Sequence, residues 1–146
     1  MVALFGILTI YLVYATGKDF FNVKTGLIAA VLYAVSPVVI IYSRASWNPN
    51  LVPFFSLLII FLSKKIVVNQ KWPLIFWLGF CFGIALQLHY LVSFLGVTVI
   101  SYFLITCGFR KYQSYLLGIV GFFAGLSPFL LFEVRKGFPN IISIFN

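Results

Sequence analysis

The sequence contains a stretch of 35 residues, from Pro73 to Cys107, without one charged side chain. A helix that crosses a bilayer needs about 20 apolar residues, so this stretch is too long for one span and fits two short ones. It is interrupted only by the polar cluster Gln87-Leu88-His89-Tyr90, which marks the expected turn between the two helices. A charge-free run of this length predicts helices surrounded by lipid.

The composition of the whole chain supports the same environment. Hydrophobic residues make up 63% of the sequence and charged residues 8%, with a mean hydropathy of +1.13, whereas a soluble domain has about 25% charged residues. We therefore predict an all-α, polytopic transmembrane helical bundle. Its membrane segments are expected at about 2–16, 27–42, 51–62, 73–88, 91–107 and 115–132.

Residues 1–146 are treated as a single transmembrane region. Met1 opens directly into an apolar run without the basic stretch that begins a secretory signal, and the sequence ends abruptly after Ile141. We expect the chain to be a fragment of a longer polytopic protein.

The net charge of +8, from ten basic and two acidic residues, would suggest nucleic-acid binding in a soluble protein. Here the basic residues fall in short loops between apolar runs, which excludes nucleic acid as a partner and favours a topological role. One side receives Lys18, Lys24, Lys64, Lys65, Lys71, Arg110 and Lys111, and the other receives Arg44, Arg135 and Lys136. The positive-inside rule then predicts that Met1, the Arg44 turn, His89 and the Glu133 tail lie outside, in a multi-pass protein of a bacterial inner or plasma membrane.

Soluble enzyme chemistry and metal binding find no support in the residue patterns. The sequence has no P-loop, G-x-G-x-x-G, H-E-x-x-H or G-x-S-x-G motif. Its single histidine excludes a metal cage of the usual His/Cys kind. Cys81 and Cys107 lie in separate apolar segments and are interpreted as small buried hydrophobes.

Glycines and prolines mark packing and bends. The pair Gly79 and Gly83, and the series Gly118, Gly121 and Gly125, predict close helix packing. A polar loop is expected between Gly17 and Gly26.

Pro37 and Pro128 predict kinks. Each belongs to a Ser-Pro pair and precedes an arginine by seven residues, followed by an aromatic residue, a proline and an asparagine (Trp47, Pro49, Asn50; Phe138, Pro139, Asn140). This is either a coincidence or a weak internal repeat.

Arg44 is the only charged residue between Lys24 and Lys64. It is either an interfacial arginine that extends to the membrane surface or a phosphate ligand, because its planar guanidinium binds phosphate through two hydrogen bonds. Trp47 is either an interface aromatic or a platform for a sugar or lipid. Asn48 is expected to cap the next helix, with Pro49 as its first residue.

The remaining polar residues outside the Arg44 turn are interpreted from their positions in the sequence. His89 and Tyr90 either form a polar cap on their hairpin or contact a substrate. Glu133 either pairs with Arg135 or Lys136, or touches a substrate. Asp19 is interpreted as a solvated loop charge.

Several of these stretches together resemble a known family. Gly26–Pro37, Tyr42-Ser43-Arg44, Gln87–Tyr90 and Ser127–Asn140 are similar to bacterial glycosyltransferase family 39, which includes relatives of the protein O-mannosyltransferases and of the lipid A aminoarabinose transferase. The resemblance implies part of a C-type glycosyltransferase membrane domain. Such enzymes transfer a sugar from a polyprenyl-phosphate donor at the outer face to a lipid, glycan or protein acceptor, inverting the anomeric centre. A general base deprotonates the acceptor, and cationic groups, in some cases with a divalent metal, stabilise the departing phosphate.

The resemblance also implies which residues take part. Substrate and phosphate contacts are expected from Arg44, Trp47, Asn48, His89, Tyr90, Glu133 and Arg135. The family carries an acidic pair in its first external loop, whereas the only acidic residues here are Asp19 and Glu133. The catalytic acids are therefore expected upstream of Met1, and no catalytic residue or cofactor is assigned here; a divalent metal stays open for the full-length enzyme. The alternative function is that of a non-catalytic polytopic subunit or permease fragment, although no segment carries a charge in its middle.

Overall fold

The computed structural model describes residues 1–139, which form helices and the turns that join them. The helices are α1 (Val2–Phe20), α2 (Val23–Val35), α3 (Pro37–Arg44), the 3₁₀ turn η1 (Asn48–Leu51), α4 (Val52–Val67), α5 (Leu74–Leu88), α6 (Val92–Cys107), the 3₁₀ turn η2 (Gly108–Lys111) and α7 (Tyr112–Lys136). The prediction of an all-α bundle with about six apolar segments is confirmed for these residues, with α2 and α3 together forming the second segment. Asn140 and the rest of the expected C-terminal tail lie outside the described residues.

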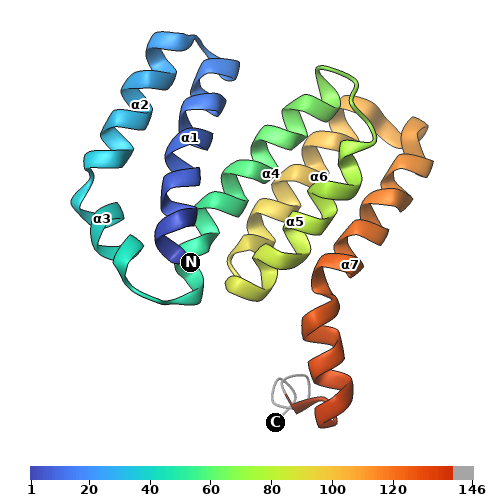
Figure 1. The fold of residues 1–146 in the computed structure, drawn as a ribbon. Coiled ribbons are helices and arrows are strands. Elements are labelled where there is room, and N and C mark those ends of the chain that lie inside the picture. The colour runs from blue at the N-terminus through green and yellow to red at the C-terminus, as the bar shows by residue number, and fades with distance from the viewer. Residues whose placement is uncertain (140–146) are drawn as a thin grey trace.

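The long helices run alternately up and down the bundle (Figure 1). The connections α1–α2, α4–α5 and α6–α7 lie at the upper end of that view, and seven basic residues lie in them or in the adjoining helix ends; we call this the basic end. The start of α1, the turn after α3 and the α5–α6 turn lie at the lower end, which we call the Arg44 end. The sorting of basic residues to two ends therefore corresponds to the alternation of the helices.

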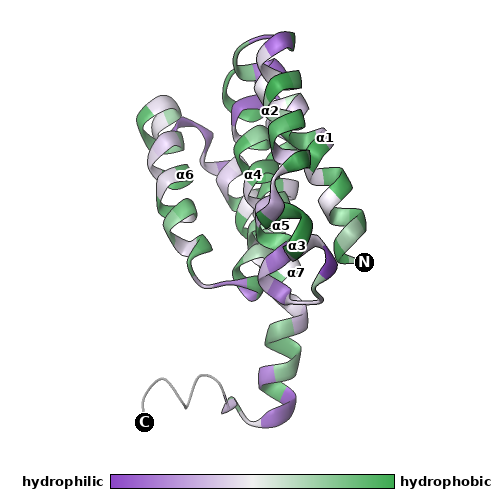
Figure 2. Cartoon of the chain, turned by 90° about the vertical axis from the view of Figure 1, so that its left-hand side faces the viewer, coloured by the Kyte–Doolittle hydropathy of each residue, from purple (hydrophilic) through white to green (hydrophobic). Residues whose placement is uncertain are grey.

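Polar residues are concentrated at these two ends, and apolar residues along the helices between them (Figure 2). Three helical stretches of the described chain are long and apolar enough to cross a membrane: Val2–Phe20, Asn48–Val67 and Val92–Lys136. The third contains both α6 and α7, joined through η2. The bent pair α2–α3 adds a fourth candidate, and α5 is a shorter apolar helix.

The connection between α1 and α2 differs from the expected loop. Only Phe21 and Asn22 separate the two helices, and the Asn22 side chain caps α2 by accepting a hydrogen bond from the Thr25 N–H (2.9 Å). The prediction of a loop from Gly17 to Gly26 is wrong because the two glycines let the helices approach. A Cβ on Gly17 would lie 2.8 Å from the Gly26 Cα.

Pro37 interrupts the second segment. The preceding Ser36 is extended (ψ 122°), as the residue before a proline is biased to be, and the axes of α2 and α3 differ by 59°. Pro128 instead lies inside the continuous helix α7. Proline cannot donate to the carbonyl four residues back, and the Ser127 hydroxyl donates to that Ala124 oxygen (2.7 Å). The two Ser-Pro pairs thus give different backbones, so the structure gives no support to an internal repeat.

The predicted close packing at the glycine series is confirmed, and the structure shows that the two series bring α5 and α7 into backbone contact. A Cβ on Gly79 would lie 2.0 Å from the Gly118 oxygen, and one on Gly121 would lie 2.0 Å from the Phe76 oxygen. Gln87 closes the same interface, because its Nε2 donates to the carbonyls of Gly83 (3.0 Å) and Gly125 (2.8 Å). Small residues and an amide hydrogen bond are the usual means of joining helices in lipid.

Two apolar clusters form the interior, and both include residues of α4. One contains Phe55, Ile59 and Ala85, together with the buried thiol of Cys81. The other lies toward the basic end around Ile66 and Phe103, with the half-buried Cys107 packed against it. Both cysteines are free thiols in apolar surroundings, which agrees with their interpretation as small hydrophobes.

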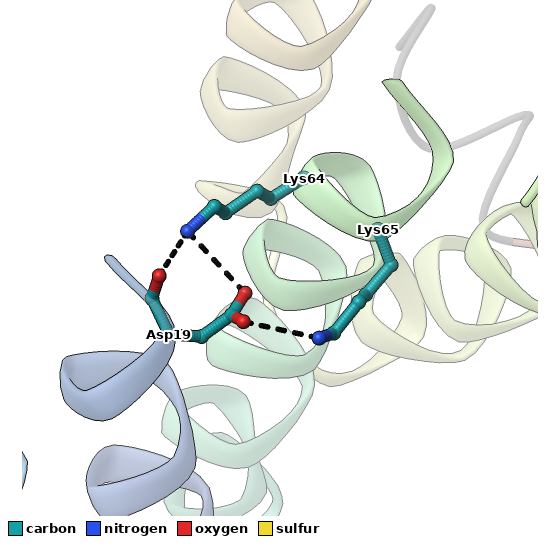
Figure 3. Close-up of polar contacts among 3 residues, drawn as sticks. All are labelled: Asp19, Lys64 and Lys65. Atoms are coloured by element: carbon teal, nitrogen blue, oxygen red, sulfur yellow. Dashed lines mark hydrogen bonds and ion pairs between the residues drawn. The ribbon is translucent and has the colours of Figure 1, made fainter. Parts of the chain in front are cut away.

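At the basic end, Asp19 joins α1 to α4 (Figure 3). Its carboxylate lies 3.1 Å from the Lys65 Nζ and 3.4 Å from the Lys64 Nζ, and Lys64 also donates to the Asp19 carbonyl. All three side chains are about one quarter exposed. The interpretation of Asp19 as a solvated loop charge is therefore wrong: the end of α1 packs against α4 and brings the three charges together.

Candidate functional site

The turn after α3 is built around Asn50. The Asn50 Nδ2 donates to the carbonyls of Tyr42 and Ala45, both at 2.8 Å, and so binds the C-terminal end of α3 to the start of the next helix. Arg44 is the last residue of α3 and is exposed. The sequence indicates no such role for Asn50, because its partners are backbone carbonyls that no residue pattern specifies.

A pocket of about 480 Å³ lies beside this turn, and we call it the Arg44 pocket. Arg44, Ser46, Trp47 and Asn48 line one part of it. The start of α1, with Leu51 and Leu88, completes the lining, so residues from three distant parts of the chain meet here. Three of the expected substrate contacts therefore share one cavity at the Arg44 end.

Asn48 does not cap a helix with its side chain. Trp47 occupies the N-cap position of η1 and Asn48 is its first residue, while α4 begins only at Val52. The N-cap prediction is wrong because the chain enters α4 through a 3₁₀ turn. The exposed Asn48 side chain lies instead at the wall of the Arg44 pocket.

A second, smaller cavity of about 260 Å³ adjoins the first, and Ser43 and Trp47 line both. Thr9 of α1 and Tyr33 of α2 bring hydroxyl groups to its wall. Thr9 is only 2% exposed, and its hydroxyl donates to the Phe5 carbonyl (2.6 Å). Sequence reasoning missed these residues; the available signal was a hydroxyl side chain within each of two apolar segments.

His89 and Tyr90 form the turn between α5 and α6 at the Arg44 end. Their rings stack with centroids 4.9 Å apart, and the His89 Nδ1 accepts a hydrogen bond from the Leu91 N–H (3.2 Å). Because Nδ1 is an acceptor, Nε2 is the nitrogen that can donate to another group. His89 follows Leu88, which lines the Arg44 pocket, and Tyr90 is exposed.

Glu133 and Arg135 lie elsewhere at this end. They belong to the last turns of α7, which project beyond the α5–α6 turn in Figure 1. Glu133 is 1% exposed and Arg135 is exposed. The described lining of the Arg44 pocket includes neither residue, because α7 packs along α5 and not against α3.

The described residues do not fit a metal ion. Nowhere in residues 1–139 do three His, Cys, Asp or Glu side chains come together. Asp19 is at the basic end, and Glu133 and His89 are at the other.

An apolar bundle with its charges at two ends and a polar-walled pocket at one of them defines an integral, multi-pass membrane protein. The family model of dolichyl-phosphate-mannose-protein mannosyltransferases matches residues 1–132, and the chain belongs to this family. The resemblance to glycosyltransferase family 39 is thereby confirmed. Membership implies a relationship to the glycosyltransferases that use polyprenyl-phosphate sugars as donors. Neither the curated proteins nor the solved structures gave a match.

Proposed function

We propose that the chain is the donor-binding part of a membrane glycosyltransferase that moves a sugar from a polyprenyl phosphate to a lipid, glycan or protein acceptor. The observation that carries the proposal is the Arg44 pocket, where Arg44, Trp47 and Asn48 line one cavity at the end of an apolar bundle. Membership of the family supplies the reaction class.

The proposed role of Arg44 follows from its chemistry. A guanidinium stays charged and presents paired N–H donors that match two phosphate oxygens. When the sugar leaves, negative charge grows on the phosphate, and a fixed cation beside it lowers the barrier. The capping of α3 by Asn50 supports this role, since it fixes the backbone on both sides of Arg44.

Other proposed contacts surround this cation. The Trp47 ring is 59% exposed and borders both cavities, which suits it to contact a sugar or the first prenyl units. Asn48 offers an amide to the same ligand. His89 would donate from Nε2, with Tyr90 stacked on its ring.

Arg135, which is exposed, is proposed to contact the acceptor and not the donor phosphate, with the buried Glu133 two residues before it on the same helix end. Their position on the projecting end of α7 favours this division. None of the described residues is proposed as the catalytic base.

The proposed orientation puts the Arg44 end outside the membrane-enclosed compartment. Seven basic residues lie at the opposite end and three at this one, including Arg44 itself. Short basic loops are retained on the cytoplasmic side. An outward Arg44 end would meet a donor whose headgroup faces outward.

The test is binding of undecaprenyl phosphate to the purified chain in phosphatidylcholine nanodiscs. Charge-assisted hydrogen bonds contribute about 1.5–3 kcal/mol, so Arg44→Ala should weaken binding about tenfold to a hundredfold. Arg44→Lys should give an intermediate loss, because lysine keeps the charge without the paired donors. Lys136→Gln is the matched control, since it removes a charge from the same end without touching the pocket.

Equal affinities for the native chain, Arg44→Ala and Arg44→Lys would rule out the phosphate role. That result would favour the alternative of a non-catalytic subunit or permease fragment, which no specific feature of the described residues supports. Loss of binding in Lys136→Gln to the same extent as in Arg44→Ala would also contradict the proposal, because it would make the effect one of net charge alone.

A further inference from the structure

A larger hollow of about 570 Å³ lies between α5, α6 and α7, away from the Arg44 pocket. We call it the lipid-side groove; its walls include Leu78, Phe82, Ile100 and Phe122. The only polar side chain among its lining residues is Tyr115, whose hydroxyl donates to the Gly108 carbonyl (2.7 Å). Whatever fills the groove must therefore be apolar, because a polar group there would lack a partner.

The length of the groove corresponds to part of one leaflet. It extends along α6 from Gly96 to Leu104 and along α7 from Tyr115 to Phe122. At about 1.5 Å per residue these stretches measure roughly 11–12 Å, less than half of the roughly 30 Å hydrocarbon core.

The groove is closed toward the middle of the bundle. The rings of Phe82 and Phe122 lie 5.8 Å apart, and a Cβ on Gly96 would meet the Phe82 ring at 2.3 Å. A spanning helix would need a groove that continues past this point. An acyl chain that enters from one membrane surface does not need the groove to continue past this point.

Two basic residues directly follow a lining residue of the groove. Phe109 of η2 lines the groove, and the next two residues, Arg110 and Lys111, are exposed. The Lys111 Nζ lies 5.4 Å from the centre of the Trp72 ring. Over residues 1–139, the ion pairs are those of Asp19 with Lys64 and Lys65. Neither Arg110 nor Lys111 takes part in one.

We propose that the lipid-side groove binds an anionic phospholipid, with one acyl chain between the helices and its phosphate at Arg110 and Lys111. Basic residues at the mouth of a cleft between membrane helices attract anionic headgroups. The site lies at the basic end and is independent of the donor site proposed at Arg44.

The first test removes the charges. The chain is placed in phosphatidylcholine nanodiscs containing phosphatidylglycerol, and the lipid that stays bound after release is measured by native mass spectrometry. Each basic residue near an anionic surface contributes about fivefold to binding, so Arg110→Gln with Lys111→Gln should lower phosphatidylglycerol affinity roughly thirtyfold. The control is Lys18→Gln with Lys24→Gln, which removes the same charge from the facing ends of α1 and α2 at the same end of the bundle.

The second test fills the groove. Ile100 lines it and is 61% exposed, so Ile100→Trp should occupy the groove and abolish retention of phosphatidylglycerol. Ile105 lies on the same helix outside the groove and is 86% exposed, so Ile105→Trp should leave retention unchanged.

Equal retention of phosphatidylglycerol and phosphatidylcholine would overturn the proposal. So would unchanged binding in the Arg110 and Lys111 double variant, whose substitutions lie on the surface. A dimer that Ile100→Trp dissociates would assign the groove to a second copy of the chain and would overturn it as well.

Discussion

Gly121 lies where α7 meets α5, and alanine at this position tests the packing that holds these two helices together. A Cβ there would lie 2.0 Å from the Phe76 oxygen and 3.1 Å from the Phe76 Cα. Carbon and oxygen atoms normally approach to about 3.3 Å, so the helices would have to separate by about 1.3 Å. The oxygen belongs to the backbone of α5 and cannot rotate away as a side chain would.

The cost can be worked from two contributions. Overpacking in a close-packed interior costs about 1–3 kcal/mol. Separation of the helices also weakens the Gln87 hydrogen bond to the Gly125 carbonyl, and such bonds between membrane helices contribute about 0.6 kcal/mol. We expect Gly121→Ala to lower the free energy of unfolding by about 2–4 kcal/mol.

The assay is reversible unfolding in mixed micelles by titration with sodium dodecyl sulfate, followed by circular dichroism. Gly6→Ala is the matched control, because its Cβ would lie at an ordinary 3.4 Å from the Ser43 Cβ. It should change the free energy of unfolding by no more than about 0.5 kcal/mol. A Gly121→Ala variant as stable as the native chain, or a Gly6→Ala variant equally destabilised, would refute the reasoning.

A double variant sharpens the same test. Gly79→Ala strains the other side of this interface, where its Cβ would lie 2.0 Å from the Gly118 oxygen. Once the helices have separated for one alanine, the second requires less movement. The two substitutions together should therefore cost less than the sum of their separate effects, by about 1 kcal/mol; strict additivity would argue against one shared interface.

Two smaller predictions concern the two ends of the bundle. Asn50→Ala removes both hydrogen bonds to the end of α3, which should lower the free energy of unfolding by about 1–2 kcal/mol and weaken undecaprenyl phosphate binding; unchanged values for both would contradict the capping role. Asp19→Asn breaks the ion pairs with Lys64 and Lys65 and should cost no more than about 1 kcal/mol, because the groups are partly exposed. Added salt should reduce this difference, and a difference independent of salt would contradict an ionic origin.

Much of the architecture follows from the distribution of charged and small residues along the chain. In lipid, a backbone must satisfy its hydrogen bonds internally, so each apolar run becomes a helix and the basic residues lie at or beyond the helix ends. This reasoning predicted the hairpin at His89, the two ends of the bundle and close helix packing at the two glycine series, but not that these series face each other. It failed between Gly17 and Gly26, where close approach of two backbones replaced a loop with helix.

The candidate site was predicted in part. Arg44, Trp47 and Asn48 are near one another in sequence and line one cavity in the structure. The hydroxyls of Thr9 and Tyr33 were missed, because only the crossing of α1 and α2 brings them beside Trp47. Glu133 and Arg135 reach the same end of the bundle but not the same pocket, because α7 packs along α5 and not against α3.

By itself, the sequence determined that the helices of this protein lie in lipid, how many apolar segments there are, and at which end of the bundle each charge lies. These properties depend on local composition, because apolar segments enter the bilayer and charged residues stay at its surfaces. Only the tertiary structure decided which residues meet across the bundle: Asp19 with two lysines, Gln87 with α7, and α1 with the Arg44 turn. Helices that are apolar on all sides carry no stripe that fixes their rotation. Glycine contacts, helix breaks and single hydrogen bonds set that rotation instead, and they exist only once the helices are packed.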